Sequence, residues 1–286
     1  MADTIHLALP KGRMQGAIFA LLADAGVRVT VGSRAYRPHL SLPGFEVKLL
    51  KPQTIVEMLH AGTRDLGFAG ADWVAEKQAD LTCVLDTALD PVRVVAAAPY
   101  ALLERGELPA RPLVVASEYG RLTADWIARR GLDARFVRSY GATEVFPPED
   151  ADCIVDNTAT GATLEANGLA ILDEVMRSST RLYAHPKALD SKEKRGIIEH
   201  LAMLLGSVLE ARRRVMVELN VGADRLEAVV AILPCMREPT ISRLHGDVGY
   251  AVKAAVPRDT LPMLIPQIKA AGGSDIVVSP IGQIVP

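Results

Sequence analysis

Short, almost continuously apolar runs alternate with segments of helical periodicity over the first 156 residues, and this alternation limits the possible fold more than any other feature. Strands that are apolar throughout are typical of a parallel sheet that helices cover on both faces. The predicted strands are 4–9, 45–50, 65–70, 92–98, 113–117, 134–138 and 153–156. The predicted helices are 12–25, 52–60, one that starts at Ala71, and 122–130. The sequence therefore predicts two α/β units of similar size, joined near residues 90–93.

The C-terminal part of the chain has a different order of elements. The predicted strands are 214–221, 240–246, 250–257 and 275–281, and the predicted helices are 223–233 and 260–273. The order βαββαβ is that of a ferredoxin-like unit. A long helical stretch at 188–214 precedes this unit, and its apolar stripe indicates packing on one of the α/β units.

Composition and charge exclude several classes of protein. With 286 residues the chain is long enough for two or three domains. Its net charge of −2 gives no global positive field, so we expect binding neither to nucleic acid nor to a membrane. No apolar run approaches the roughly 20 residues of a membrane span, and the first residues lack a signal-peptide pattern, so a cytoplasmic protein is expected. The three cysteines are far apart and predict neither a disulfide framework nor a thiolate metal site.

The segment after the strand at 153–156 carries more hydrogen-bonding groups than a turn needs. Asp156 ends the strand, and the residues that follow are Asn157, Thr158, Ala159, Thr160, Gly161, Ala162 and Thr163. Amides and hydroxyls where a helix begins at the carboxyl edge of a sheet form a phosphate cradle, and an acid beside it suits the hydroxyls of a sugar. Threonine and glycine also start helices that bind no ligand, so the pattern alone leaves both interpretations open.

Two earlier loops lie at the same kind of edge. Lys11 and Arg13 follow the first predicted strand, where two cations can neutralise a polyphosphate or simply form a solvated turn. Gly67, Gly70 and Asp72 close another strand in a D-x-G-x-x-G run. That run resembles the two-lobed periplasmic-binding-protein architecture, although a tight turn with an Asp cap would have the same sequence.

Strand, Asp156 and Thr-Gly-x-Thr together resemble the phosphoribosyl-pyrophosphate loop of phosphoribosyltransferases. Val155 stands where the commonest class of those enzymes has the first of two adjacent acids, so that version of the fold does not match cleanly. Motifs along nearly the whole chain are similar to one family, the long, regulated form of ATP phosphoribosyltransferase of histidine biosynthesis. These motifs are LPKGRM, DLGFAGADW, YGATEVFP, IVDNTATGATLEANGL, REPTIS and DIVVSPIGQI.

The resemblance implies a fold and a set of domains. It implies an α/β catalytic core that is two-lobed and periplasmic-binding-protein-like (type II), followed by a ferredoxin-like (ACT-like) βαββαβ domain. The implied domains are a discontinuous lobe I (1–91 and 177–211), a lobe II with the phosphoribosyl pyrophosphate loop (92–176) and a regulatory domain (212–286).

The resemblance also implies the reaction. ATP would attack C1 of phosphoribosyl pyrophosphate through N1 of its adenine and release pyrophosphate, a glycosyl (pentosyl) transfer. Asp156, Lys11 and Arg13 are the implied catalytic residues. Asp156 and the residues Asn157, Thr158, Ala159, Thr160, Gly161, Ala162 and Thr163 would bind phosphoribosyl pyrophosphate. The residues implied for ATP are Lys11, Gly12, Arg13, Lys51, Gly70, Asp72 and Glu144.

Cofactor, assembly and regulation follow from the same resemblance. Mg2+ would be held mainly by the substrate phosphates, and its protein ligands stay unknown. A homo-oligomer, the hexamer, is implied, together with feedback inhibition by histidine bound near Asn220 and Thr240. The family often has an acid where this chain has Asn220, and Glu218 lies close by in sequence.

Two other functions fit parts of the pattern. The two lobes would also suit a small-molecule sensor or binding protein without catalysis. A prephenate dehydratase-like enzyme likewise couples a two-lobed core to a small regulatory domain, but that lyase has no need for a phosphate cradle with paired basic loops.

Overall fold

The computed structural model describes residues 4–32 and 36–285, so residues 1–3 and 33–35 of the predicted lobe I and residue 286 of the predicted regulatory domain lie outside the description. The chain divides into two compact units. The larger unit extends to residue 200 without 21–26, and the C-terminal unit takes 21–26 and the chain from 201 onward. The predicted lobe boundaries stay predictions.

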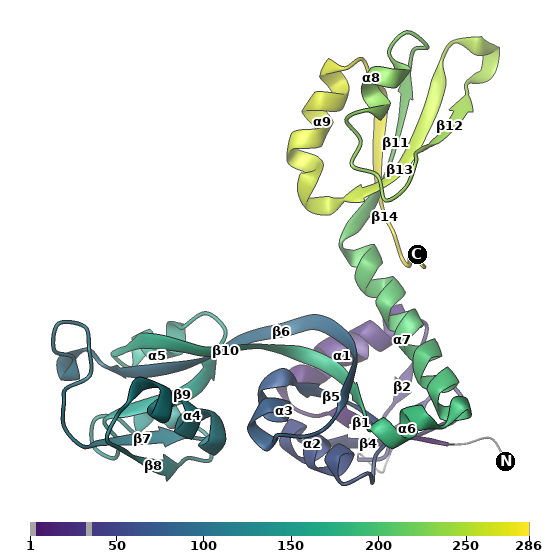
Figure 1. The fold of residues 1–286 in the computed structure, drawn as a ribbon. Helices are drawn as coiled ribbons and strands as arrows, with labels where there is room; N and C mark the ends of the chain where they lie inside the picture. The colour runs from purple at the N-terminus through teal and green to yellow at the C-terminus, as the bar shows by residue number, and fades with distance from the viewer. Residues whose placement is uncertain (1–3, 33–35, 286) are drawn as a thin grey trace. The chain divides into compact units, whose positions relative to one another are not determined.

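Among the described residues, the larger unit is built on one eight-stranded sheet in the order β4-β1-β5-β10-β6-β9-β7-β8 (Figure 1). Its strands are β1 (Ile5–Pro10), β4 (Phe45–Leu50), β5 (Leu66–Gly70), β6 (Thr82–Pro99), β7 (Leu113–Ser117), β8 (Ala134–Arg138), β9 (Cys153–Thr158) and β10 (Leu169–Ala184). A small two-stranded sheet pairs β2 (Val29–Thr30) with β3 (His39–Leu40). The helices are α1 (Arg13–Asp24), α2 (Pro52–His60), α3 (Ala71–Lys77), α4 (Gly120–Arg130), α5 (Ala162–Ala166), α6 (Pro186–Asp190) and α7 (Lys192–Arg212), with short 3-10 turns η1 (Tyr100–Leu102) and η2 (Thr143–Val145). The end of α1 from Leu21 and the part of α7 from Leu201 belong to the C-terminal unit.

Two long strands, β6 and β10, belong to both halves of this sheet. They pair antiparallel with each other from Leu169↔Pro99 to Ala184↔Thr82. The last part of β10 also pairs with β5, and the last part of β6 also pairs with β9. β4, β1 and β5, here called the first strand group, are parallel to one another, as are β9, β7 and β8, the second strand group. Figure 1 shows β6 and β10 running from one group to the other.

The half of the sheet that holds the second strand group and the end of β6 is packed on both faces, as the continuous apolar runs predict. On β6, Val94 and Ala96 join the apolar cluster that contains Trp126 of α4, and their neighbours Val95 and Ala97 join a cluster on the opposite face. All five side chains are at most 1% exposed. A strand alternates its side chains between faces, so an apolar residue at every position is stabilised only if both faces are covered.

The predicted parallel pairing is present within each strand group, but β6 and β10 run antiparallel to each other and to the strands beside them. β10 was not predicted, and β6 is longer than the predicted 92–98 because it begins at Thr82. The sequence of β10, LAILDEVMRSSTRLYA, has polar and charged residues through its middle, and eight of its first ten residues are half-buried or exposed. A strand with so little burial gives neither the continuous nor the alternating apolar pattern on which sequence-based prediction depends.

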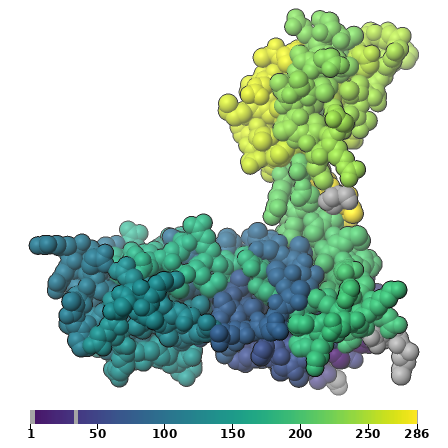
Figure 2. Space-filling model, viewed as in Figure 1, coloured from purple at the N-terminus to yellow at the C-terminus, as the bar shows by residue number. Residues whose placement is uncertain are grey.

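The C-terminal unit confirms the predicted βαββαβ order. It contains β11 (Arg214–Val221), α8 (Leu226–Val230), β12 (Thr240–Arg243), β13 (Tyr250–Pro257), α9 (Leu261–Ala270) and β14 (Ser274–Pro280), with 3-10 turns η3 (His245–Asp247) and η4 (Arg258–Thr260). Its sheet has the antiparallel order β12-β13-β11-β14. Residues 214–280 of this unit are coloured from green to yellow in Figure 2.

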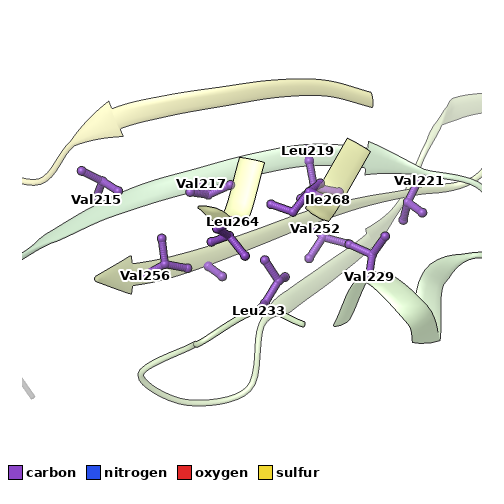
Figure 3. Packing of buried hydrophobic residues seen from close by; sticks show 11 residues of the cluster. Val215, Val217, Leu219, Val221, Val229, Leu233, Val252, Val256, Leu264 and Ile268 are labelled. Carbon is purple, nitrogen blue, oxygen red and sulfur yellow. The ribbon is translucent and has the colours of Figure 1, made fainter. Parts of the chain in front are cut away.

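The core of the C-terminal unit lies between this sheet and its helices. Val217 and Leu219 of β11 pack with Leu264 and Ile268 of α9, and each is at most 3% exposed (Figure 3). The intervening residues of β11 are only half-buried, which is the alternation expected for a sheet with one covered face.

Three smaller expectations have clear outcomes. The predicted strand 240–246 ends at Arg243, because Gly246 turns the chain with a φ of 78°. The three cysteines are free, as expected. Within residues 4–32 and 36–285, no helix is both long and apolar enough to span a membrane.

Candidate active site

The predicted site residues follow the carboxyl ends of parallel strands. Lys11 follows β1, Lys51 follows β4 and Asp72 lies just beyond β5, all within the first strand group. Asn157 lies near the carboxyl end of β9 in the second strand group. Parallel strands bring their carboxyl ends to one edge of a sheet, where open α/β sheets bind ligands.

Residues from both strand groups line one hollow of about 180 Å³, here called the mixed-charge hollow. Five of the predicted site residues line it, namely Lys11, Arg13, Gly70, Asp72 and Asn157. The other lining residues are Met14, Pro52, Gln53, Trp73, Asp90, Val92, Tyr119, Ser178, Ser179 and Thr180. The fold therefore gathers two cations, two aspartates and several hydroxyls that are far apart in sequence.

Asp72 is the most enclosed polar group of this hollow. It is 5% exposed, and its carboxylate accepts hydrogen bonds of 2.6 Å from Ser178 Oγ and 2.6 Å from the Tyr119 hydroxyl. Its own amide donates to Ser178 Oγ at 3.0 Å. A Cβ at Gly70 would lie 2.1 Å from Asp72 Oδ1, so glycine is needed at this position. Both carboxylate oxygens are engaged, which makes Asp72 an organising group rather than a free base.

Tyr119 joins the two strand groups within this network. Its hydroxyl donates to Asp72 and accepts from Asn157 Nδ2 at 2.9 Å. Burial, and then the neighbouring Asp72 carboxylate, raise the pKa of Tyr119 far above its ordinary value, so the hydroxyl stays protonated. Its ring lies against Trp73, with ring centroids 4.7 Å apart.

Asp156 lies in a second acidic environment at the end of β9. Burial raises the pKa of its carboxyl to about 6, and the carboxylates of Glu118 and Glu144 add to the rise. The Asn157 amide donates to Asp156 Oδ1 at 2.7 Å and opposes it. At neutral pH this carboxylate is ionised, but it holds its charge less readily than an exposed aspartate does.

The hydroxyl-rich loop from Thr158 to Thr163 is held by its own side chains. The Gly161 amide donates to Thr158 Oγ1 at 2.9 Å, and the Ala162 amide donates to Thr160 Oγ1 at 3.3 Å. Gly161 has a φ of 91°, a backbone conformation that favours glycine. Helix α5 begins at Ala162 and has five residues. Thr160 and Thr163 are exposed, so the loop is open to a ligand.

Comparison with known proteins identifies the family. The profile of HisG, ATP phosphoribosyltransferase, matches residues 51–207, and the profile of the HisG C-terminal domain matches residues 211–283. The chain belongs to the ATP phosphoribosyltransferase family. The family is that of a transferase of histidine biosynthesis, so the chain is a pentosyltransferase, as its motifs predict.

Relatives cover almost the whole of this phosphoribosyltransferase. The ATP phosphoribosyltransferase of Pelotomaculum thermopropionicum is 37% identical over 99% of each chain. That of Solibacter usitatus is 36% identical over 98% of this chain and 99% of its own. A structure of the ATP phosphoribosyl transferase (HisG:HisZ) complex from Thermotoga maritima aligns with a TM-score of 0.63 and 27% identity, covering 71% of this chain and 99% of that one.

The structure places the remaining predicted residues of this phosphoribosyltransferase outside the mixed-charge hollow. Gly12 turns the chain between β1 and α1 with a φ of 83°. Glu144 lies on η2, where its charge acts on Asp156. Lys51 precedes α2 and lines a neighbouring hollow together with Lys11.

Asn220 and Thr240, the predicted histidine contacts, are brought together in the C-terminal unit. Both line a hollow of about 400 Å³, here called the sheet-face hollow, to which Glu218 and Lys253 also contribute. Asn220 Nδ2 donates to the carboxylate of Asp275 at 3.1 Å. An acid therefore lies beside Asn220 in space, although the chain lacks the one that the family often has at this position.

Tyr119, Trp73 and Ser178 were not predicted as site residues. Trp73 stands inside the quoted DLGFAGADW motif, and Tyr119 follows the predicted strand 113–117 at its carboxyl end. An aromatic residue at the carboxyl end of a predicted strand could have indicated these two site residues. Ser178 lies on β10, a strand that was not predicted, so the sequence around Ser178 did not indicate a site residue.

Proposed function

We propose that the chain transfers the phosphoribosyl group of phosphoribosyl pyrophosphate to N1 of ATP, giving phosphoribosyl-ATP and pyrophosphate. The N1–C1 bond forms as the bond from C1 to the pyrophosphate oxygen breaks. The observation that carries this proposal is the mixed-charge hollow, where Lys11 and Arg13 lie on the same lining as Asn157. Two polyanions and a sugar need cations, hydroxyl partners and an acid at one place.

The loop Thr158–Thr163 binds the 5′-phosphate of the donor in this proposal. Support comes from its exposed threonines and from the left-handed Gly161, which lets the backbone approach a ligand closely. The amides of Gly161 and Ala162 already bond to threonine hydroxyls. A phosphate would replace these internal contacts with charge-assisted ones, which are roughly twice as strong as neutral hydrogen bonds.

Asp156 binds the ribose hydroxyls and faces the positive charge that develops on the sugar. Its raised pKa of about 6 leaves it ionised at neutral pH, in a half-buried place where a negative charge is poorly solvated. A cationic transition state relieves that cost, whereas a neutral ground state does not. Asp156 therefore favours the transition state over the bound substrate.

Lys11 and Arg13 bind the departing pyrophosphate. Lys11 is half-buried in the connection after β1, Gly12 turns the chain, and the exposed Arg13 begins α1. Preorganised cations stabilise a leaving group as its charge grows. Gly70, Asp72, Lys51 and Glu144 are assigned to ATP, with Asp72 holding the Tyr119 hydroxyl in place.

Mg2+ is proposed as the cofactor. In the described part of the chain no three His, Cys, Asp or Glu side chains cluster as a metal site. We propose that the ion arrives with the substrate phosphates and is held mainly by their oxygens. The ion would neutralise charge on the pyrophosphate.

A direct assay tests the function. The protein is mixed with ATP, phosphoribosyl pyrophosphate and Mg2+, and the ultraviolet absorbance of an N1-substituted adenine is followed. We expect an absorbance rise that needs both substrates. A flat trace from folded protein would favour a binding protein without catalysis.

Regulation and assembly are part of the proposal. We propose that histidine binds at the sheet-face hollow and inhibits, and that the chain forms a hexamer in the cytoplasm. The solved Thermotoga maritima relative is itself a complex, which supports assembly. Titration calorimetry with histidine and the mass from light scattering test these two points. Absence of heat at millimolar histidine, or a monomeric mass, would contradict them.

A further inference from the structure

Helix α4 begins without a capping group from its own part of the chain. Its N-cap residue, Tyr119, makes no capping hydrogen bond with its side chain, and the first turn, GRLT, contains no acid. The first amides of a helix lack partners within the helix and carry a partial positive charge. Here the carboxylate of Glu76 accepts from two of them. The Arg121 amide lies 3.1 Å from Oε1 and 3.0 Å from Oε2, and the Leu122 amide lies 3.0 Å from Oε2.

Glu76 belongs to the other strand group. It lies on α3, which follows β5 of the first strand group, whereas α4 follows β7 of the second. Asp72 is four residues earlier on α3 and so lies on the same face of the helix, where it accepts from the Tyr119 hydroxyl at 2.6 Å. Trp73 packs against the Tyr119 ring. These three side chains of α3 and residues 119–122 form what is here called the α3–α4 contact.

The α3–α4 contact is buried. Glu76 is 8% exposed, and Tyr119 is fully buried. A buried carboxylate needs hydrogen bonds that replace its lost water, and both oxygens of Glu76 receive theirs from amides that follow the second strand group. The contact therefore forms only when the two strand groups lie in this arrangement.

The two strand groups are also joined by β6 and β10, and this pair of strands is irregular in its middle. Its register shifts between Ser178 and Thr180 and again between Thr180 and Arg181. On β6, Ala88 and Asp90 have φ values of 53° and 47°, in the left-handed region that favours glycine. Irregularities of this kind interrupt the ladder and bend the strands. The α3–α4 contact is thus a second, separate connection that restricts bending at this point.

We propose that Glu76 is a positioning residue, which holds the two strand groups in the arrangement that completes the mixed-charge hollow. This inference rests on the proposed function and adds a residue to it. The described lining of the hollow includes Asp72, Trp73 and Tyr119 of the α3–α4 contact but not Glu76. Glu76 therefore acts on the hollow through α4 and its neighbours on α3.

The proposed binding of phosphoribosyl pyrophosphate depends on the same arrangement. In the proposed function Lys11 and Arg13, next to the first strand group, bind its pyrophosphate. The loop 158–163, next to the second, binds its 5′-phosphate. This substrate bridges the strand groups, so its binding and the α3–α4 contact favour one arrangement and stabilise each other.

Steady-state kinetics of Glu76→Gln test the proposal. Glutamine has the same shape but no charge, and its single oxygen replaces a carboxylate that accepts from two amides. Loss of a charge-assisted hydrogen bond is expected to lower kcat/KM for phosphoribosyl pyrophosphate about tenfold. The KM for ATP should change less than about threefold, because most of the residues proposed for ATP lie next to the first strand group.

Gly131→Ala is the matched control for the stability of α4. Gly131 caps the other end of this helix with a φ of 63°, where alanine is strained, and its added Cβ would meet nothing within 4 Å. Both variants should lower the melting temperature, but only Glu76→Gln should lower kcat/KM. A fall in kcat/KM of the same size in Gly131→Ala would mean that Glu76 merely stabilises α4, which would overturn the proposal.

Hydrogen exchange tests the α3–α4 contact in the wild-type protein and needs no variant. Mass spectrometry follows peptides that contain Arg121 and Leu122, without ligand and with saturating phosphoribosyl pyrophosphate and Mg2+. Linkage predicts that the donor slows exchange of these two amides at least about threefold and affects the carboxyl end of α4 less. Exchange that does not respond to the bound donor would overturn the proposal.

Failure of the proposed function would give a different result. Absence of product from the folded wild-type protein would contradict that function. Product formation with equal kcat/KM in the wild-type and in Glu76→Gln would leave the function in place and overturn the role of Glu76.

Discussion

The mixed-charge hollow of the larger unit and the sheet-face hollow of the C-terminal unit hold their polar groups in different ways. In the first, Asp72 is buried and its two oxygens accept hydrogen bonds from Tyr119 and Ser178. In the second, the pair Glu218–Lys253 is short, at 2.6 Å, but both side chains are about half exposed. Catalysis needs groups that are fixed before the substrate arrives, whereas a regulatory ligand can be met by groups that rearrange.

The comparison predicts that changes at the larger unit cost much more than changes at the sheet-face hollow. The four variants that follow run from the largest expected effect to the smallest.

Asp156→Asn should reduce kcat/KM by about 100-fold or more, a magnitude typical of removing one preorganised group that stabilises the transition state. The measurement is steady-state kinetics with both substrates. Glu165→Gln is the control, since the Glu165 side chain is exposed on α5. Equal kcat/KM in Asp156→Asn and the wild-type would exclude Asp156 from the reaction.

The same variant should be more stable than the wild-type at neutral pH. The folded pKa of Asp156, about 6, lies above its ordinary 3.8, so the folded state binds the proton more tightly. Stability from this group is present at low pH and is lost as the pH rises from about 4 to about 6. Asparagine removes that loss, which is on the order of 1 kcal/mol for a half-buried group. Urea unfolding at pH 4 and pH 7.5 measures it, and an equal pH dependence in both proteins would contradict it.

Tyr119→Phe should lower the free energy of unfolding by about 1–3 kcal/mol, because it leaves a buried carboxylate oxygen of Asp72 without its donor. The hydroxyl also accepts from Asn157, so the two strand groups lose one connection. Urea unfolding gives the value. Tyr140→Phe is the matched control, since Tyr140 is 91% exposed. Equal losses for the two variants would mean that the Asp72 network adds no stability.

Gly161→Ala should cost about 1–2 kcal/mol, because alanine is strained at a φ of 91°. The loop would distort, and the KM for phosphoribosyl pyrophosphate should rise. Gly196→Ala in α7 is the matched control: its added Cβ meets nothing within 4 Å, and a helix interior gains about 0.8–1 kcal/mol from this exchange. The two variants should shift the melting temperature in opposite directions, and shifts of the same sign would contradict the strain.

Lys253→Ala should have the smallest effect, a change in unfolding free energy below about 0.5 kcal/mol, because exposed ion pairs contribute little. Thermal unfolding at low and high salt measures it, and the small difference should vanish at high salt. A loss as large as that of Tyr119→Phe would remove the contrast between the two hollows.

Much of the larger unit could be predicted because buried strands and helix faces show an apolar pattern in the sequence. The run 153–156 lies within β9, where the first three residues are buried. FEVKLL is β4 over the same residues, and its buried Val47 and Leu49 alternate with less buried neighbours. β10 could not be predicted, because its middle residues are half-buried and its place is set by pairing with distant β6. The periodicity of a short segment does not indicate which distant strand it pairs with.

The candidate site was predictable where its residues follow strand ends and not where they come from β10. Lys11, Arg13, Asp72 and Asn157 line one hollow because strand ends share an edge, and their roles stay predictions. Ser178 was missed with its strand. Tyr119 was missed because the value of its hydroxyl depends on Asp72, which lies 47 residues away in sequence.

The pairing of β6 with β10 has a consequence for how this chain can vary. Pro99 and Leu169 are direct partners, and the Tyr100 amide donates to the Gly168 carbonyl at 3.1 Å. The segment 100–168 therefore begins and ends at adjacent positions of the β6–β10 ladder. Recombination between relatives can exchange it as one cassette, and a chimera made at these two positions keeps both junctions inside an existing β-ladder.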